Sequence, residues 1–362
     1  MQRATRKPVL IAVGGCDPVG TGRQVELLTE GLVRGGWDVH VAVTSHGGGI
    51  VERLRAAGVR ARCVGRRPTT DFGAGLRLMR LARELEPAVV LSFGRRQAEL
   101  AAVARLVLPG MRAVAHVAAP VRGSRLRWSL RRMDRVIATS PGVAASCGRL
   151  GVSDGRIVTI APGIAPDRGQ GLDREAVAAR LGLDPAAEWT LCVAPFVAAS
   201  RLERLLWAID QLGVVRKGLQ HVLVGAGPLL SRVRRRARVQ ELAERLFVFR
   251  DCDVLPDLLG QARLVWQPGS TAFGGAILDA MARGVPAVAV DGDAARQLIV
   301  DGHTGWIVPP LPESEFPRRA FNLLEDEAMR MRFAAAAAER AAVEFPVERM
   351  VAAFAEMLER LG

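Results

Sequence analysis

The sequence predicts an α/β protein with two parallel sheets, and three observations support this fold class. Short apolar runs alternate with stretches of helical periodicity along the whole chain, as expected for parallel strands joined by crossover helices. A loop rich in Pro, Gly and Asp, from Ala161 to Arg174, divides the series into two. At 362 residues the chain is long enough for two domains, each with its own core. We therefore expect two Rossmann-like halves facing each other across a cleft, where ligands of open α/β sheets bind.

Seven strands are expected in the first half, most of them separated by helical patterns. They run from Val9 to Val13, Val39 to Thr44, Val59 to Val64, Val89 to Phe93, Ala113 to Val117, Val136 to Thr139 and Ile157 to Ile160. The first run follows three basic residues and precedes Cys16, as in a lipoprotein signal. It is short for such a signal, so we interpret it as a buried strand.

The second half is expected to contain five strands and a helical tail. The strands run from Thr190 to Val193, Val222 to Val224, Phe247 to Phe249, Leu264 to Trp266 and Ala287 to Val290. The tail, from Pro317 to Leu361, is helical and rich in Ala. We place the first domain at residues 1–165 and the second at 186–340. Residues 341–362 are expected to form a helix that crosses back to the first domain.

The composition is that of a soluble globular protein. Hydrophobic residues make up 49% of the chain and charged residues 24%, and no apolar run reaches the roughly 18 residues of a spanning helix. The five cysteines are scattered, so neither a disulfide framework nor a zinc site is indicated, and a reducing cytoplasm is expected. The net charge of +13 calls for an anionic partner, which can be phosphate, lipid or nucleic acid.

The stretch STAFGGAILDAMARGVPAVAV, Ser270 to Val290, has the pattern of a phosphate-binding turn. Gly274 and Gly275 follow a strand and open a helix that we expect from Ala276 to Arg283. Two glycines at a helix start expose backbone N–H groups, and the helix dipole favours negative charge there, which suits a diphosphate. A turn whose glycines only allow close packing explains the same pattern equally well.

Three other glycine-containing loops are notable. Gly225 and Gly227 lie between a strand and a helix in the second half, and Gly20–Thr21–Gly22 follows the first strand. The latter loop lacks the Lys of a P-loop and the spacing of dinucleotide binders, which counts against ATP and NAD. The stretch DGHTGW, Asp301 to Trp306, is expected to be a plain β-turn.

Taken in order, these motifs resemble the retaining glycosyltransferases of the GT-B fold, family 4. GTGRQVELLTEGLVRGGWDVHVAVTS resembles that family's glycine loop, helix and second strand, and MDRVIATSPGVAASCGRLGVSDGRIVTIAPGI resembles its interdomain approach. HVLVGAGPL resembles its G-x-G-P loop, and FGGAILDAMARGVPAVAV with DGHTGWIVPP resembles its donor-site signature. The resemblance covers nearly the whole chain.

The resemblance implies a nucleoside diphosphate sugar in the second half, an acceptor against the first half, and transfer without a metal or other cofactor. Positive side chains and helix-end N–H groups would stabilise the leaving phosphate. Gly20–Thr21–Gly22 would form the acceptor-side loop. The residues assigned to the donor site are Gly225, Gly227, Phe273, Gly274, Gly275 and Asp279.

The donor signature departs from the family pattern. Family members carry two glutamates eight positions apart, the first on the transferred sugar and the second on the ribose. Here these positions are Thr271 and Asp279. Asp279 keeps an acceptor on a side chain shorter by about 1.5 Å, and Thr271 keeps a hydroxyl without a charge. Gln297 stands where the family has a further acidic residue.

The cationic pair that grips the diphosphate in the family is out of register here. Pro195 and Ser200 occupy the positions of its Arg and Lys, and Arg201 follows directly. Loss of two charge-assisted hydrogen bonds would cost about 3 to 6 kcal/mol. We expect Arg201 to supply the surviving diphosphate contact; the competing interpretation is a solvated residue at a helix start.

His116 lies just past an apolar strand, where relatives carry a histidine near the acceptor and the sugar. A pKa near neutrality would suit proton handling or a hydrogen bond to a sugar hydroxyl, and a structural histidine fits the same position. The candidate catalytic residues are His116, Thr271 and Arg201. The other histidines show no metal-ligand spacing, and no metal site is expected.

Two basic runs account for much of the positive charge, RGSRLRWSLRRMDR (Arg122 to Arg135) and SRVRRRAR in the second half. In the first, Leu126, Leu130 and Met133 fall on one helical face with Trp128 and arginines around it. Such a helix can rest on an anionic membrane near a lipid-linked acceptor, or face the core with its arginines in water. No helix-turn-helix or zinc pattern is present, so nucleic acid is not an expected partner.

The predicted function is the transfer of a hexose from a nucleoside diphosphate sugar to a glycan or lipid-linked hydroxyl acceptor, with retention. The expected location is the cytoplasm, with peripheral contact at the inner face of the membrane. The alternative is a catalytically inactive relative that keeps the fold as a binding or scaffold protein. The altered cationic pair and donor signature favour this alternative, whereas the glycine loops and Asp279 favour activity.

Overall fold

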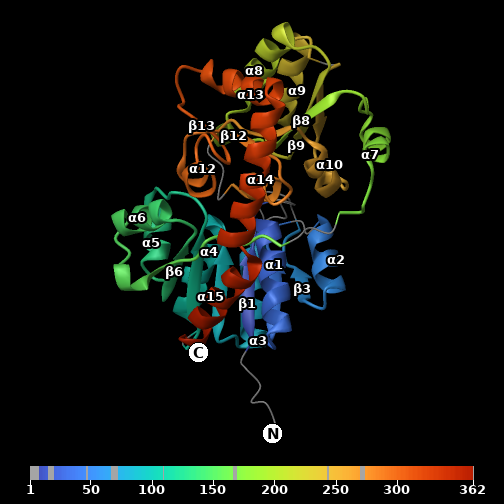
Figure 1. Cartoon of the computed structure of the whole chain (residues 1–362). Helices are drawn as coiled ribbons and strands as arrows, with labels where there is room; N and C mark the ends of the chain where they lie inside the picture. Colours follow the sequence, from blue (N-terminus) through green and yellow to red (C-terminus); the bar gives the residue numbers. More distant parts are fainter. Residues whose placement is uncertain are drawn as a thin grey trace. The chain divides into compact units, whose positions relative to one another are not determined.

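The structure is a computed structural model that describes residues 8–14, 20–45, 48–66, 72–108, 110–165, 169–242, 244–269 and 274–361 (Figure 1). The chain divides into two compact units. Unit 1 consists of Met1–Gly163 and Phe345–Gly362, and unit 2 of Ile164–Glu344. Each unit is an α/β layer structure around a parallel sheet, so the predicted fold class is confirmed.

Unit 1 contains a seven-stranded parallel sheet in the order β3-β2-β1-β4-β5-β6-β7. Its strands are β1 (Val9–Val13), β2 (Val39–Val43), β3 (Arg60–Cys63), β4 (Val89–Phe93), β5 (Arg112–Val117), β6 (Arg135–Ala138) and β7 (Ile157–Thr159). All residues of β1, β2 and β4 are buried. Their near-continuous apolar sequences are typical of strands covered on both faces.

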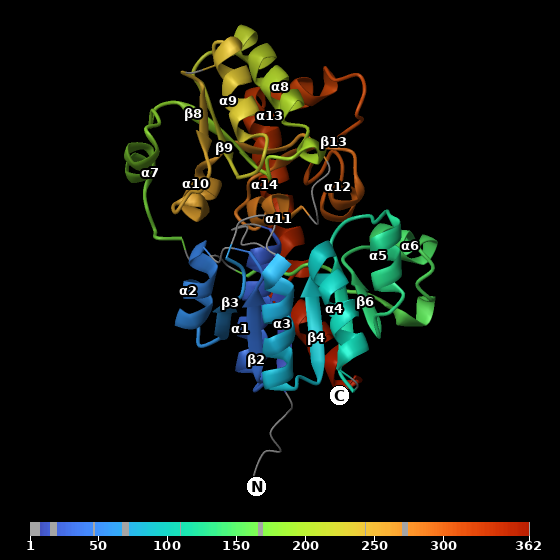
Figure 2. The ribbon, with the colours of Figure 1, turned by 180° about the vertical axis from the view of Figure 1, so that it is seen from behind.

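Helices cover both faces of this sheet, and Figure 2 shows the face opposite to that of Figure 1. One layer contains α1 (Thr21–Arg34), which packs against α2 (Gly48–Ala56) and α15 (Val347–Glu359). The other contains α3 (Phe72–Leu85), α4 (Arg95–Val107) and α5 (Ser124–Leu130), which pack in sequence. The helix α6 (Pro141–Arg149) begins at Ser140, whose hydroxyl accepts a hydrogen bond from the N–H of Val143.

The point where the chain leaves unit 1 is held by a buried side chain. Gln24 of α1 donates from Nε2 to the carbonyl of Gly163 at 2.8 Å and accepts from the Gly163 N–H at 3.0 Å. A Cβ on Gly163 would lie 2.9 Å from Cα of Val347, which begins α15. The outgoing chain and the returning helix α15 therefore pack against each other within unit 1.

Unit 2 contains a six-stranded parallel sheet in the order β10-β9-β8-β11-β12-β13. Its strands are β8 (Glu188–Val193), β9 (Leu219–Val224), β10 (Leu246–Phe249), β11 (Leu264–Gln267), β12 (Ala287–Val290) and β13 (Gly305–Val308). One helical layer contains α8 (Leu202–Val215), α9 (Leu230–Val239) and α13 (Glu315–Glu325), whose buried side chains share one core cluster. The remaining helices are α7 (Arg174–Leu181), α10 (Leu255–Gln261), α11 (Gly275–Met281), α12 (Asp293–Leu298) and α14 (Glu327–Glu344).

The strand β13 corrects the expectation of a plain turn at Asp301 to Trp306. The turn ends at Thr304, and the residues from Gly305 onward pair with β12 in register with Ala287. A Cβ on Gly305 would lie 2.6 Å from the carbonyl oxygen of Ala287, so this position requires glycine for close strand pairing.

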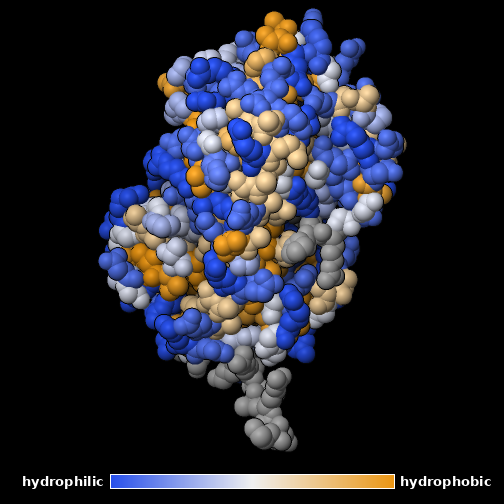
Figure 3. Space-filling model, in the orientation of Figure 1, coloured by the Kyte–Doolittle hydropathy of each residue, from blue (hydrophilic) through white to orange (hydrophobic). Residues whose placement is uncertain are grey.

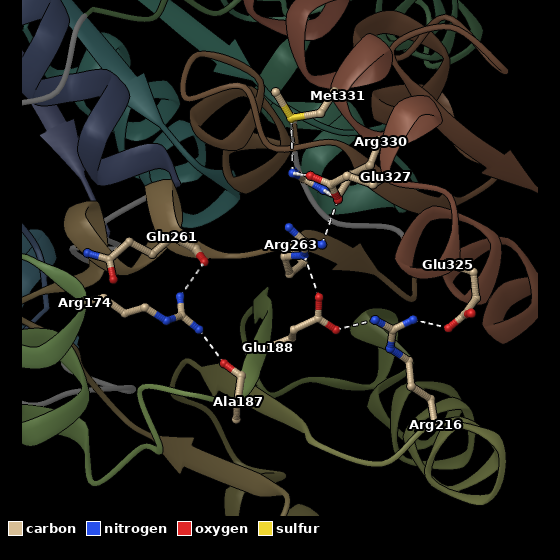
Figure 4. Close-up of polar contacts among 10 residues, drawn as sticks. All are labelled: Arg174, Ala187, Glu188, Arg216, Gln261, Arg263, Glu325, Glu327, Arg330 and Met331. Atoms are coloured by element: carbon tan, nitrogen blue, oxygen red, sulfur yellow. Dashed lines mark hydrogen bonds and ion pairs between the residues drawn. The ribbon is translucent and has the colours of Figure 1, made fainter.

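Ion pairs connect the elements at the amino edge of the unit 2 sheet (Figure 4). Glu188, which begins β8, pairs with Arg216 at 2.5 Å and with Arg263 at 2.9 Å. Arg263 also pairs with Glu327 of α14 at 2.7 Å. The network is completed by Arg216 with Glu325 and by Glu327 with Arg330. Within this network three arginines therefore pair with three glutamates.

The surface is mainly hydrophilic on the face shown in Figure 3, where mildly hydrophobic residues lie over α14. This helix contains the Ala-rich part of the tail. Among the residues that the structure describes, no helix combines the length and the hydropathy needed to cross a membrane.

Candidate functional site

The carboxyl edge of the unit 2 sheet contains a topological switch point. From the central strand β8 the chain proceeds to β9 and β10 on one side, and then crosses to β11 on the other side. The loops that follow the adjacent strands β8 and β11 therefore run in different directions. Open α/β sheets bind ligands in the crevice between two such loops. These two loops touch, because a Cβ on Gly269 would lie 2.4 Å from the carbonyl oxygen of Ala199.

The glycine loop after β9 packs directly on the loop after β8. Gly225 and Gly227 have φ angles of +156° and +152°. A Cβ on Gly225 would lie 2.0 Å from the carbonyl oxygen of Ala194, and one on Gly227 would lie 2.5 Å from that of Phe196. The N–H of Phe196 also donates to the carbonyl of Ala226 at 2.8 Å. Close contact between the loops after β8 and β9 is therefore enough to explain why both positions are glycine.

The predicted phosphate-binding turn leads into α11, which starts at Gly275, one residue earlier than expected. Gly274 is the N-cap with φ of +70°, and a Cβ there would lie 2.9 Å from Cδ1 of Leu298. Asp279 is 4% exposed and has an interaction partner. Two other predicted site residues, Thr271 and Phe273, lie outside the described residues.

The two positions at which relatives carry the cationic pair interact with each other. The hydroxyl of Ser200 is buried and donates to the carbonyl of Pro195 at 2.5 Å. The space between the two positions is therefore bridged by a neutral hydrogen bond. A cation for this edge has to come from elsewhere.

Arg201, the candidate replacement, is exposed and forms the N-cap of α8 with φ of +49°. It borders a hollow of ≈ 380 Å³. The hollow is lined by Ala198, Arg201, Glu203, Arg204, Leu229, Arg232 and Glu313. Three arginines against two glutamates leave it with one net positive charge.

Arg204 was not predicted from the sequence, although it is well placed at this edge. Its guanidinium donates to the carbonyl of Pro268, just after β11, at 3.0 Å and to that of Pro310, just after β13, at 3.1 Å. It therefore ties together the loops that follow two strands. The only sequence signal is its position in the first turn of the helix after β8.

The carboxyl edge of unit 1 has its own switch point, between β1 and β4. The predicted acceptor-side loop lies here: Gly20 is the N-cap of α1, Thr21 is partly buried and Gly22 is buried. Gln97 was not predicted. It donates from Nε2 to Thr44 Oγ1 at 2.7 Å, so α4 and the end of β2 meet at this edge.

His116 lies inside β5, not past its end, and is 7% exposed. Its ring stacks on Phe93 with centroids 4.4 Å apart, and the ring of Phe354 from α15 is 6.2 Å away. Burial lowers the pKa of His116 to about 3. This pKa lies far below the near-neutral value that would suit proton handling, so the imidazole stays neutral across the physiological pH range. Its Nδ1 has no hydrogen-bond partner among the described residues.

Two parallel-sheet units with glycine loops at their carboxyl edges form the architecture expected of the GT-B class of glycosyltransferases. The chain belongs to the glycosyltransferase family. Residues 18–168 match Glycosyltransferase Family 4, and residues 173–340 match Glycosyl transferases group 1.

Individual relatives agree with this assignment. The chain is 30% identical over 249 residues to the lipopolysaccharide core biosynthesis mannosyltransferase LpsB of Rhizobium meliloti, covering 65% of this chain and 68% of the relative. It is 29% identical over 189 residues to an alpha-D-kanosaminyltransferase of Streptomyces kanamyceticus, covering 50% of this chain and 49% of the relative. The chain thus spans about half the length of that Streptomyces relative.

A solved structure supports the fold. The structure of Anabaena Alr3699/HepE in complex with UDP-glucose matches with a TM-score of 0.82 at 17% identity, covering 98% of this chain and 99% of the other. At this identity the likeness concerns the fold alone.

Proposed function

We propose that the protein transfers a hexose from a nucleoside diphosphate sugar to a hydroxyl acceptor, with retention of configuration and without a metal. The observation that supports this most is that both halves of the chain match glycosyltransferase families. The relatives include a mannosyltransferase of lipopolysaccharide core biosynthesis, and a structural neighbour was solved with UDP-glucose.

In this proposal the donor occupies the carboxyl edge of unit 2. The turn at Gly274 and Gly275 approaches the diphosphate, Asp279 accepts a hydrogen bond from the ribose, and the loop of Gly225 and Gly227 borders the nucleotide. Thr271 faces the transferred sugar through its hydroxyl. Arg201 and the backbone N–H groups oppose the charge that develops on the leaving diphosphate, which is the role of a metal in other transferases.

The acceptor occupies the carboxyl edge of unit 1, at the loop Gly20–Thr21–Gly22. His116 contributes as a neutral hydrogen-bonding group, because its low pKa excludes an imidazolium at physiological pH. Its unpartnered Nδ1 supports this role, since a buried polar atom without a partner is costly unless a ligand satisfies it.

A thermal-shift panel tests the proposal. UDP, GDP, ADP and their sugars are each added to the full chain, and one nucleotide series is expected to raise the melting temperature, because a ligand that binds only the folded state stabilises it. The stabilising sugar nucleotide is then used in a turnover assay with and without EDTA, which is expected to leave the rate unchanged. No stabilisation by any nucleotide would contradict the proposal.

A binding protein without turnover is the second candidate. The hydrogen bond between Ser200 and Pro195 favours it, because the two positions that hold charge in the family are occupied by neutral groups bonded to each other. A nucleotide that stabilises the chain without any transfer or hydrolysis of its sugar would select this candidate.

Arg201→Ala is expected to weaken nucleoside diphosphate binding about tenfold to a hundredfold, because a charge-assisted hydrogen bond contributes about 1.5 to 3 kcal/mol. Calorimetry with the nucleotide found in the panel measures the change. Arg235→Ala, on the exposed side of α9, removes the same charge from the same unit and serves as the control. Equal affinities of Arg201→Ala and the unmodified chain would show that Arg201 does not contact the diphosphate.

We further propose a cytoplasmic location with peripheral contact at an anionic membrane, where a lipid-linked acceptor is found. An apolar patch on unit 1 supports this. It consists of Val103, Leu106 and Val107 of α4 and Trp128 of α5, which are 41%, 65%, 43% and 38% exposed. Arg125 borders the same hollow as Val103 and Trp128, and Arg132 lies 4.1 Å from the Trp128 ring centroid. Apolar residues beside cations are typical of interfacial binding.

Sedimentation with anionic vesicles tests the membrane contact. Binding is expected at low salt and should weaken as salt screens the arginines. Leu106→Ser/Trp128→Ser should abolish most of it. Val214→Ser/Val215→Ser removes two side chains that are 73% and 65% exposed on unit 2 and should have no effect. Absence of binding by the unmodified chain at low salt would exclude the contact.

A further inference from the structure

Five arginines surround a hollow of ≈ 290 Å³ at the amino edge of the unit 1 sheet. Its lining residues are Arg105, Arg112, Asp134, Arg135, Arg156, Arg360 and Leu361. Arg112 and Arg135 begin β5 and β6, whereas the other arginines come from α4, the 3₁₀ turn Asp154–Arg156 and the end of α15. Segments that are distant in sequence thus bring the same type of side chain to one place.

Among the described residues that line the hollow, one carboxylate faces these arginines, and it is already satisfied. Asp134 accepts two hydrogen bonds from Arg105, at 2.9 and 2.7 Å, and one from the N–H of Ala113 at 2.9 Å. Burial alone would raise the pKa of Asp134, but the hydrogen bonds from Arg105 and Ala113 outweigh burial and hold the pKa below its usual value. Asp134 is therefore charged, and its carboxylate is shared between Arg105 and Arg112, whose guanidinium donates to Oδ1 at 3.4 Å.

The other guanidinium groups meet little negative charge. Arg135 donates to the carbonyl of Asp134 at 3.0 Å and Arg156 to the carbonyl of Arg131 at 3.3 Å. Arg360 pairs with Glu356, one turn earlier on α15, whose side chain is 64% exposed. Carbonyl oxygens carry no net charge, so the hollow remains strongly positive. The amino edge of unit 2, where three glutamates meet three arginines, shows how such a cluster is balanced elsewhere in this chain (Figure 4).

We propose that this hollow binds a phosphoryl anion, with a diphosphate as the best match. Phosphoryl oxygens accept the paired N–H groups of guanidinium forks, and two linked groups supply enough negative charge for several arginines. The site lies at the opposite end of β5 from the carboxyl edge, about 17 Å away along the strand. It is therefore separate from the sugar-transfer site proposed above.

Calorimetry of the full chain with inorganic pyrophosphate in metal-free buffer tests the site. Arg156→Gln/Arg360→Gln removes two guanidinium groups that make no bond to Asp134, so the packing of unit 1 should persist and the melting temperature should not change. Pyrophosphate affinity should fall about tenfold or more. Arg235→Gln/Arg236→Gln, two exposed residues of α9, changes the net charge equally and should alter affinity by less than about twofold. Equal effects of the two double variants, or no effect of the first, would overturn the proposal.

A second arm distinguishes a dissolved phosphoryl ligand from a lipid headgroup. The same variants are sedimented with vesicles of phosphatidylglycerol and of phosphatidylcholine. If the ligand is a lipid headgroup, Arg156→Gln/Arg360→Gln should weaken binding to phosphatidylglycerol vesicles, and pyrophosphate should compete with these vesicles. If the ligand is a dissolved phosphoryl compound, pyrophosphate binding should depend on these arginines and vesicle binding should not. If neither pyrophosphate nor vesicle binding depends on them, the hollow is not a phosphoryl site.

Discussion

Replacing Gly225 by Ala is expected to lower the free energy of unfolding of unit 2 by about 4 kcal/mol. The added Cβ would lie 2.0 Å from the carbonyl oxygen of Ala194 and 3.0 Å from its carbon, and neither atom belongs to a side chain that can rotate away. The loop after β8 would have to shift, and with it the segment that leads to Ser200 and Arg201. Chemical denaturation measures the loss of stability, and calorimetry should show weaker nucleotide binding.

Gly218→Ala separates the steric effect from the backbone effect. Gly218 also has a positive φ, +78°, but no heavy atom lies within 4 Å of a Cβ built there. Gly218→Ala therefore costs only the free energy of holding an alanine in the left-handed backbone conformation, about 1 to 2 kcal/mol. A cost for Gly225→Ala no greater than that for Gly218→Ala would show that the loops after β8 and β9 are not in close contact.

Acidification from pH 6.5 to 4.5 is expected to destabilise each unit by about 2 kcal/mol, because His116 in unit 1 and His221 in unit 2 are buried as neutral rings. Burial lowers the pKa of His116 in unit 1 to about 3, and burial together with Arg245 lowers that of His221 in unit 2 to about 3. An unfolded histidine binds its proton near pH 6.5, whereas the folded one does not. Stability is therefore fully present above pH 6.5 and decreases as the pH falls toward 3.

The surroundings of His221 explain why it stays neutral. Thr190 Oγ1 lies 2.6 Å from Nδ1 of His221 and accepts a hydrogen bond from the Trp266 indole at 2.8 Å. The Thr190 hydroxyl can therefore donate to Nδ1 of the neutral ring while it accepts from the indole. Burial is the main cause of the low pKa, and the positive charge of Arg245 adds to it.

Denaturation curves between pH 4.5 and 6.5 measure the effect of the buried histidines. Asp134, Asp291 and Glu327 have pKa values below their usual range, so these carboxylates lose their protons well below this window. The double variant His116→Gln/His221→Gln should make the pH dependence much weaker and leave the part that comes from His40, whose pKa is also lowered by burial. His303→Gln, at an exposed position, should not change it. An unchanged slope in the double variant would disprove the assignment.

The strands were predictable from the sequence because a parallel sheet covered by helices on both faces requires continuous apolar runs. The bounds of β1, β4 and β12 agree with the prediction. The prediction missed the first residues of β8, since Glu188 is polar and belongs to the strand through its backbone pairing with β9. It also missed β13. This strand begins at Gly305, which is recognisable as a strand residue only through its pairing with β12.

The basic run from Arg122 to Arg135 was expected to form one helix. The structure ends α5 at Leu130, and β6 begins at Arg135. Leu126, Leu130 and Met133 are all buried, as predicted, whereas Trp128 is 38% exposed. Met133, however, lies beyond the end of α5 and so is not part of a helical face. Periodicity therefore identified the buried side of this segment but not its length.

The sequence by itself determined the two α/β halves, the order of their strands along the chain and the loops that lie at the carboxyl ends, because apolar periodicity and glycine positions are local properties. Only the tertiary structure decided the state of the site residues. The neutrality of His116 depends on rings from Phe93 and Phe354, and the neutral bridge from Ser200 to Pro195 depends on how the loop after β8 folds. Desolvation and hydrogen-bond partners are set by atoms brought together in space, so spacing along the chain cannot reveal them.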